Sequence, residues 1–376
     1  MSINKDFNHS FWEKKHLFKK YDVIIVGAGI VGLSTALSIK ERHKKSNILI
    51  IERGALPTGA STKNAGFACF GSVGEILDDL LHMDENSVWQ TVAMRYEGLK
   101  LLRKRIGDKA MQYKKYGGYE IFKEKSAFQS CLQNVEFLNK KIKQNLGLQH
   151  CFQALKEPSY GFNKIVGVIK NKYEGQIETG LMMKQLEKMA LEKNINILFN
   201  CNLIHFLQLN SGVQLETNIG DFLCDKMVIA TNGFAKNLIP QLDVNPARSQ
   251  VLITKPIKDL KIKGSFHFDK GYYYFRNIDN RILLGGGRNL DFKTESTDSF
   301  ALNTNIQKQL DFLLKNIILP KTKFEVDYRW TGIMGVGKEK KPIIDLYSQD
   351  IIVAVRMGGM GLAIGSLVGD KASKLI

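Results

Sequence analysis

The sequence predicts a fold of the α/β class, and three observations near the N-terminus carry that prediction. A run of apolar, mostly β-branched residues at Val23 to Val26 leads directly into the turn Gly27-Ala28-Gly29-Ile30-Val31-Gly32. We expect a helix from this turn to about His43, followed by a second apolar strand from Ile48 to Ile51. That strand ends in Glu52, about twenty residues after the last glycine of the turn. Strand, glycine turn, helix, strand and acidic end together predict a Rossmann-like βαβ unit.

The three glycines of the turn have different expected roles. Gly27 permits a sharp turn, Gly29 lets backbone N–H groups approach a pyrophosphate, and Gly32 lets the helix pack closely on the strand. Ile30 and Val31 begin the helix, whose unpaired N–H groups and partial positive charge would face the phosphates. Glu52 stands at the offset at which an acidic side chain meets a ribose hydroxyl. The sequence therefore predicts a dinucleotide site, with an ordinary glycine-rich βαβ turn as the alternative.

The glycine turn does not distinguish FAD from NAD, but the next loop does. After Glu52-Arg53 the chain continues through the small, polar loop Gly59-Ala60-Ser61-Thr62-Lys63-Asn64-Ala65-Gly66. This resembles the superfamily of D-amino-acid oxidase, glycine oxidase and sarcosine oxidase, in which an acidic–arginine pair precedes such a loop beneath the flavin. Similar pieces follow in order at Ala230 to Gly233, Trp330 to Pro342 and Met357 to Gly361. The resemblance covers nearly the whole chain and implies FAD bound without a covalent link.

The resemblance also implies which residues hold the FAD. In addition to the turn and Glu52, these are Arg53, Ser61, Thr62, Lys63, Asn64, Ala65, Gly66, Thr231, Asn232, Gly233, Gly332, Gly358, Gly359, Met360 and Gly361. The last four follow the apolar strand Ile351 to Val355 and precede a helix. Their N–H groups can stabilise negative charge on the flavin pyrimidine. A second dinucleotide site and a plain glycine turn are the alternatives there.

The domain organisation is expected to be discontinuous. Periodicity predicts helices at Glu75 to Ile106, Ser126 to Leu146 and Gly180 to Lys193, and short strands between Arg248 and Gly287. The resemblance implies a Rossmann-like FAD-binding domain interleaved with an antiparallel-sheet α+β substrate domain. The FAD-binding domain would take residues 1–80, 165–235 and 330–376, and the substrate domain 81–164 and 236–329.

Composition bears on the cellular location of the protein and on the kinds of site and partner it can have. The chain has 376 residues, a net charge of +17 and five cysteines, none of them in a CxxC pair. We therefore expect no disulfide framework and no metal site, and a reducing, cytoplasmic location. The sequence has no secretory signal and no run of eighteen apolar residues that could span a membrane. The positive charge suits an anionic partner, but the lysines are scattered, and codon bias is the alternative.

Three residues are candidates for the chemistry. The segment Gly271 to Asn277 resembles the strand that supplies substrate-side tyrosine and arginine in the amino-acid oxidases. Alternation along a strand places Tyr274 and Arg276 on one face together with Tyr272, so we predict that Tyr274 and Arg276 line the site. Lys63 would lie near the isoalloxazine, where a cation favours anionic flavin or superoxide. Plain packing of the tyrosines and a solvated or phosphate-bound Lys63 are the alternatives.

One position departs from the pattern of the superfamily. Relatives that oxidise amino acids commonly read Trp-x-Gly-x-Arg, and that arginine grips the substrate carboxylate. This chain reads Trp330-Thr331-Gly332-Ile333-Met334, so Met334 stands in place of the arginine. Unless Arg276, Arg288 or Lys63 substitutes, a free α-amino acid has lost its main anchor.

The resemblance therefore predicts an FAD-dependent oxidoreductase that oxidises the C–N bond of an amine or modified amino acid. Hydride would pass to flavin N5, and oxygen or a quinone would accept the electrons. The alternatives are an FAD-dependent 2-hydroxy acid dehydrogenase, a flavoprotein acting on an RNA-borne amine, and a flavoprotein that only binds or senses a ligand. We do not expect a nucleic-acid partner, because the sequence has no basic motif interleaved with aromatic residues.

Overall fold

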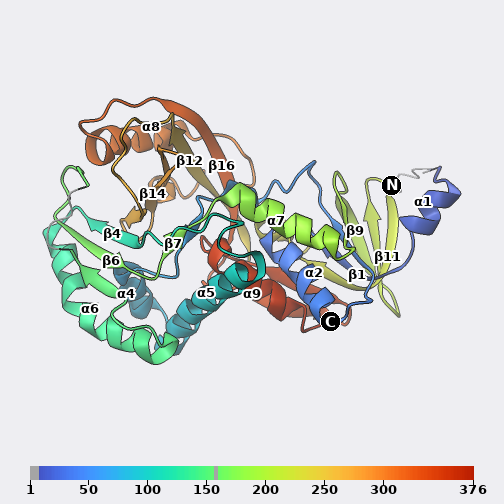
Figure 1. Cartoon of the computed structure of the whole chain (residues 1–376). Coiled ribbons are helices and arrows are strands. Elements are labelled where there is room, and N and C mark those ends of the chain that lie inside the picture. Colours follow the sequence, from blue (N-terminus) through green and yellow to red (C-terminus); the bar gives the residue numbers. More distant parts are fainter. Residues whose placement is uncertain (1–7, 156–159) are drawn as a thin grey trace.

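Two large β-sheets, joined by helices that run between them, make up the structure (Figure 1). The computed structural model describes residues 8–155 and 160–376. The first sheet has the order β17-β18-β11-β1-β2-β8, with β10 and β9 added beside β11. Its strands are β1 (Tyr21–Val26), β2 (Ile48–Ile51), β8 (Asn196–Leu198), β9 (Leu203–Gln208), β10 (Val213–Thr217), β11 (Gly220–Ile229), β17 (Ile343–Ser348) and β18 (Ile351–Val355).

The predicted βαβ unit forms the centre of the first sheet. Strand β1 pairs in parallel with both β2 and β11, and Ile25 lies opposite Ile50 and Val228. Helix α2 (Ile30–Arg42) connects β1 to β2, and β18 pairs in parallel with β11. The carboxyl ends of these four strands therefore meet at one edge, which is where ligands bind in open α/β sheets. The α/β prediction is confirmed.

The second sheet is mostly antiparallel and has the order β16-β12-β15-β14-β13-β4-β6-β5. Stacked aromatic rings fill its core, with Phe266 lying 4.9 Å from Phe275 and 4.8 Å from Tyr119 between ring centroids. Its strands are β4 (Gly118–Phe122), β5 (Phe152–Ala154), β6 (Gly167–Asn171), β12 (Asn245–Thr254), β13 (Ser265–Phe268), β14 (Tyr273–Ile278), β15 (Arg281–Gly286) and β16 (Val326–Val336). Both β6 and the end of β16 belong to this second sheet, although the predicted ranges assign them to the FAD-binding domain. The two-domain division remains a proposal.

The helices differ from expectation at one place. The prediction of a single helix from Glu75 to Ile106 was wrong, because the chain breaks at Met83 into α4 (Val73–His82) and α5 (Glu85–Ile106). Asp84 caps the second helix by accepting the N–H of Ser87 at 2.8 Å. The other helices are α3 (Ala60–Lys63), α6 (Lys125–Leu146), α7 (Thr179–Glu192), α8 (Thr304–Leu313) and α9 (Gly361–Ala372). Short one- or two-turn helices are η1 (Asn232–Asn237), η2 (Arg288–Leu290) and η3 (Leu314–Ile318), and β3 (Phe67–Ala68) pairs with β7 (Gly175–Gln176).

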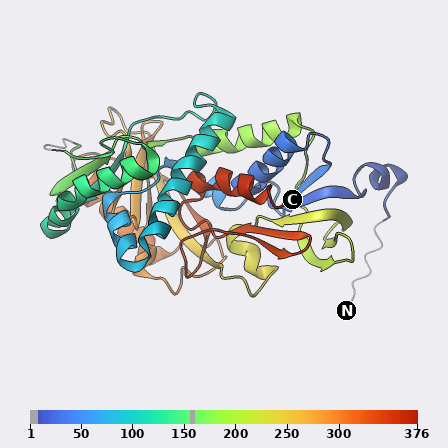
Figure 2. The same ribbon diagram turned by 90° about the horizontal axis from the view of Figure 1, so that it is seen from below.

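Helix α9 lies between α2 and α5 at the centre of the molecule (Figure 2). A Cβ added at Gly369 would come within 2.7 Å of the backbone of α2, so this glycine is required by the close approach of the two helices. Ser34 and Ser366 form a hydrogen bond of 3.2 Å between them. The last helix is therefore part of the central core.

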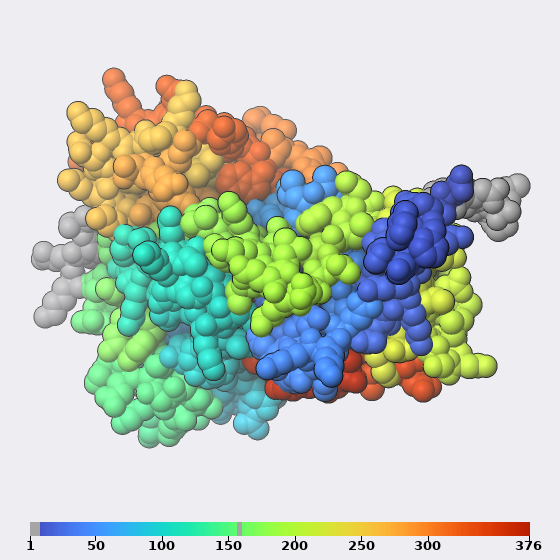
Figure 3. All heavy atoms as spheres, turned by 45° about the vertical axis from the view of Figure 1, so that its right-hand side comes forward, coloured from blue at the N-terminus to red at the C-terminus, as the bar shows by residue number. Residues whose placement is uncertain are grey.

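The N-terminal helix α1 (Phe11–His16) forms a ridge on the surface (Figure 3). Phe11 and Trp12 are 66% and 65% exposed, and the segment is held by Phe18, whose ring stacks on Phe222 at 4.8 Å. Of the described helices, none is both long and apolar enough to cross a bilayer.

Candidate active site

A cavity of about 1040 Å³ opens at the carboxyl edge of the first sheet and extends along the second. It exceeds the range of about 300–1,000 Å³ typical of small-molecule sites, so it has room for more than a compact ligand. Most residues predicted to hold the cofactor line it: Gly27, Gly29, Ile30, Val31, Glu52, Arg53, Ser61, Lys63, Asn64, Ala65, Gly66, Thr231, Asn232, Gly332, Gly358, Gly359, Met360 and Gly361. Gly32, Thr62 and Gly233 do not line the cavity.

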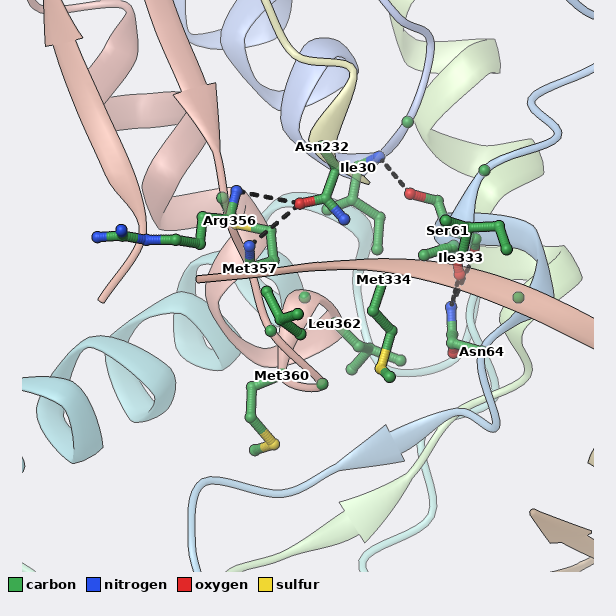
Figure 4. Close-up of a pocket in the computed structure, with 18 of the residues that line it drawn as sticks. Ile30, Ser61, Asn64, Asn232, Ile333, Met334, Arg356, Met357, Met360 and Leu362 are labelled. Atoms are coloured by element: carbon green, nitrogen blue, oxygen red, sulfur yellow. Dashed lines mark hydrogen bonds between the residues drawn. The ribbon is translucent and has the colours of Figure 1, made fainter. Parts of the chain in front are cut away.

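The glycine turn has the geometry that its sequence predicts. Gly27 has a φ of +107°, which favours glycine. A Cβ at Gly32 would overlap the carbonyl oxygen of Gly27, so Gly32 is required by packing. A Cβ at Gly29 would instead stand in the cavity, 2.9 Å from the hydroxyl of Ser61. That hydroxyl accepts the N–H of Ile30 at 2.9 Å (Figure 4), which ties the loop of α3 to the start of α2.

Glu52 is buried at the end of β2, and its carboxylate has a fixed orientation. One oxygen accepts the N–H of Ala28 at 3.1 Å and the other accepts the N–H of Gly54 at 3.1 Å. A carboxylate offers about four acceptor positions, so two of them are free for a ligand hydroxyl. The placement on the cavity wall fits the predicted ribose contact.

Asn232 fixes the turn before α9 to the end of β11. Its side-chain oxygen accepts the N–H groups of Arg356 and Met357, both at 3.1 Å (Figure 4). The adjacent Thr231 lines the cavity, and its buried hydroxyl has no hydrogen-bond partner in the described part of the chain. An orphaned buried hydroxyl in a wall of glycine turns fits a polar ligand that supplies the missing partner.

The loop around α3 is held against strand β16. The indole N–H of Trp330 donates to the carbonyl of Lys63 at 3.0 Å, and a Cβ at Gly332 would lie 3.2 Å from the Cβ of Lys63. Asn64 closes the loop by donating to the carbonyl of Ser61 at 2.7 Å. The ammonium of Lys63 lies 5.3 Å from the centre of the Phe300 ring, a cation–π distance.

Met334 points from β16 toward the turn that carries Met360 at the start of α9 (Figure 4). Its sulfur is 3.8 Å from the position of a Cβ on Gly359, and its side chain lines the cavity. The position at which the Trp-x-Gly-x-Arg pattern has an arginine therefore faces the cavity with a neutral thioether.

Tyr274 and Arg276 have different surroundings, although they share one face of β14. Tyr274 lines the cavity, and its hydroxyl forms a 3.0 Å hydrogen bond with that of Ser249. Burial raises the pKa of Tyr274, so the phenol stays protonated. Arg276 does not reach the cavity: it is 2% exposed and donates to the carbonyl of Ile177 at 2.8 Å. Gly66 covers it, so the prediction that Arg276 contacts substrate needs correction.

The family model described as "FAD dependent oxidoreductase", DAO, matches residues 22–375. The chain belongs to this family. This FAD-dependent oxidoreductase is 22% identical to the probable oxidoreductase OrdL of Haemophilus influenzae, over 94% of this chain and 82% of the relative. It is also 22% identical to gamma-glutamylputrescine oxidoreductase of Escherichia coli, over 94% and 83%. The fold matches the crystal structure of L-proline dehydrogenase from P. horikoshii with a TM-score of 0.77 and 18% identity, over 96% of this chain and 94% of that one.

The oxidoreductase also has a charged group in its cavity that sequence patterns missed. Arg95 of α5 donates to the carboxylate of Glu75 of α4 at 2.8 Å, and Glu174 and His267 also line the wall. Burial opposes the charge on Glu75, but Arg95 and Lys340 outweigh it and lower the pKa of its carboxyl. Burial raises the pKa of Glu174 to about 7 and lowers the pKa of His267 to about 4. The helix cap at Asp84 is the sequence signal that could have separated α4 from α5 and brought Glu75 and Arg95 together.

Proposed function

We propose that the FAD-dependent oxidoreductase binds FAD without a covalent link and oxidises the C–N bond of an amine or modified amino acid. Bound FAD would supply a hydride acceptor at its N5 atom. One observation carries the choice of substrate class. The glycine turns at Gly27 to Gly29 and at Gly358 to Gly361 line the cavity, and Met334 lines it at the position where relatives have a carboxylate-binding arginine.

Two of the wall residues, Tyr274 and His267, would supply orientation rather than acid–base chemistry. Tyr274 is a protonated donor fixed by Ser249 and can hold a polar group of the substrate. His267 is neutral near pH 7, because burial lowers its pKa to about 4, so it adds no charge that would repel an ammonium. A neutral amine needs little proton transfer before hydride leaves its α-carbon, so correct placement of that carbon is the main task of the protein.

The name of the E. coli relative supports an amine substrate, since gamma-glutamylputrescine oxidoreductase is named for one. Its alignment covers most of both chains. Oxygen or a quinone would reoxidise the enzyme in this proposal.

The test is anaerobic reduction of the purified holoprotein against a panel of primary and secondary amines, α-amino acids and 2-hydroxy acids. Bleaching of the flavin absorbance by amines, followed by reoxidation on admitting oxygen or a soluble quinone, is the expected result. Bleaching by 2-hydroxy acids without any response to amines would replace the proposal with the 2-hydroxy acid alternative.

A further inference from the structure

We propose that Arg288 binds a carboxylate of the substrate, and that this carboxylate is separated by methylene groups from the carbon that is oxidised. The inference rests on the proposed function and names the substrate class more closely. The site would take an amine carrying a remote carboxylate, such as an ω-amino acid.

The backbone holds Arg288 at the cavity wall. The residue begins η2 directly after β15, and Gly286 and Gly287 before it have φ values of +116° and +81°. The N–H of Gly287 donates to the carbonyl of Tyr272 at 2.9 Å. A Cβ at Gly286 would overlap that same oxygen, so only glycine allows this turn. Arg288 and Tyr272 both line the cavity as a result.

The guanidinium of Arg288 is partly buried and lacks a counter-charge. It lies 4.9 Å from the centre of the Phe292 ring, and its buried Nε has no hydrogen-bond partner within the described ranges. No ion pair to Arg288 occurs there either. The nearby Glu295 is already used, because it accepts from Arg248 at 2.8 Å and from Gln250 at 3.0 Å.

The other cations of the cavity are committed elsewhere. Four of them form ion pairs with carboxylates: Arg95 with Glu75, Lys270 with Asp78, Lys340 with Asp79 and Arg356 with Asp243. Arg53 stacks on Phe234 and Lys63 on Phe300, both in segments predicted to hold the cofactor. Among the described residues, Arg288 is therefore the cavity cation outside those segments that has neither an ion-pair partner nor a predicted role in holding the cofactor. A guanidinium binds a carboxylate through two parallel hydrogen bonds.

The location of Arg288 sets where the carboxylate lies. Strand β12 separates the two positions, since Ala247 pairs with Met334 and Gln250 pairs with Gly286. Gly286 lies two strand spacings from Thr331, and Met334 is three residues further along β16, so the end of β15 is about 14 Å from the backbone at Met334. A carboxylate held by Arg288 is thus bound from a different wall than one held by an arginine at residue 334. The carbon bearing the amine need not carry the carboxylate.

The experiment measures binding and reduction separately, with the holoprotein and its Arg288→Gln, Arg288→Lys and Lys293→Gln variants. Lys293 is the matched control, an exposed cation in the same segment that does not line the cavity. Butanoate binding is measured by calorimetry. Anaerobic flavin reduction is compared for 4-aminobutanoate and butan-1-amine, in which a methyl group replaces the carboxylate.

We expect Arg288→Gln to weaken butanoate binding about 10- to 100-fold, as for loss of one charge-assisted contact. The efficiency of reduction by 4-aminobutanoate should fall by a similar factor, while that by butan-1-amine and all values for Lys293→Gln stay unchanged. Arg288→Lys retains the charge without the two-point geometry, so it should lose about tenfold and remains informative if the glutamine variant loses FAD.

Unchanged butanoate affinity in either Arg288 variant, an equal loss in Lys293→Gln, or no butanoate binding by the wild type would overturn the inference. If amines bleach the flavin without any dependence on Arg288, the proposed function survives and the inference fails. If butanoate binds through Arg288 but no amine bleaches the flavin, the proposed function fails on its own.

Discussion

Replacing Gly29 by valine should remove the bound FAD and leave the fold intact. Gly29 has a φ of −75° and a ψ of −178°, a conformation open to any residue. Its added Cβ would meet only Ser61, at 2.9 Å from the hydroxyl and 3.8 Å from the Cβ. If the Ser61 hydroxyl rotates away from this Cβ, its hydrogen bond with the N–H of Ile30 is lost, which lowers the stability of the fold by about 1 kcal/mol. The same Cβ blocks the approach of a pyrophosphate to the N–H groups of α2. Losing two charge-assisted contacts there amounts to about 3–6 kcal/mol, or more than 100-fold in affinity.

Two measurements separate these effects. Titration of the apoprotein with FAD, followed by quenching of flavin fluorescence, gives the affinity, and urea unfolding of the apoprotein gives the stability. Gly32→Ala is the contrast, since its Cβ overlaps the backbone of Gly27 and should destabilise the apoprotein itself. The reasoning is refuted if Gly29→Val binds FAD as tightly as wild type, or if its apoprotein loses several kcal/mol of stability.

Three further substitutions test other parts of the site. Glu52→Gln should weaken FAD binding by about 1.5–3 kcal/mol in the same titration, and equal FAD affinity would mean that Glu52 does not face the ribose. The apoprotein should also lose about 1–3 kcal/mol of stability in urea unfolding, because the amide nitrogen cannot accept an N–H from Ala28 or Gly54. Met334→Arg should shift kcat/KM about tenfold toward small α-amino acids, at a cost in Tm from the unpaired charge; no change in preference would contradict the lost-anchor argument. His267 has a pKa of about 4 in the fold, below its ordinary 6.5, so it favours folding above pH 6.5 and that contribution is lost as pH falls. His267→Gln should therefore lose about 2 kcal/mol less stability than wild type between pH 7 and pH 5 in urea unfolding.

Contiguous features of this chain were predictable from sequence. The turn at Gly27 to Gly32, helix α2 and strand β2 follow one another directly, so local spacing determines their arrangement. Glu52 is at the end of β2 for the same reason, and its backbone contacts fall within the same unit. Only the resemblance to the superfamily predicted that the cofactor is FAD and that the distant turn at Met357 to Gly361 contacts it; residue spacing alone does not connect that turn to the glycine turn after β1.

Features that depend on what covers a surface were not predictable. Alternation correctly placed Tyr274 and Arg276 on one face of β14, but the segments at Gly66 and Ile177 cover only Arg276. Those segments lie far away in sequence, and no local pattern reports their contact. The break at Met83 was missed because leucines at Leu77, Leu80 and Leu81 keep helical spacing up to the cap of the next helix.

The position of α9 has a consequence for biosynthesis. The ribosome makes the glycine turn of β1 early, whereas β18 and the turn at Met357 to Gly361 emerge more than three hundred residues later. Until they emerge, β11 lacks its β18 neighbour and α2 exposes the surface against which Gly369 packs. A nascent chain can therefore form the first βαβ unit without a closed cavity. The cavity that would hold FAD is therefore complete only after β18, the turn at Met357 to Gly361 and α9 have been synthesised.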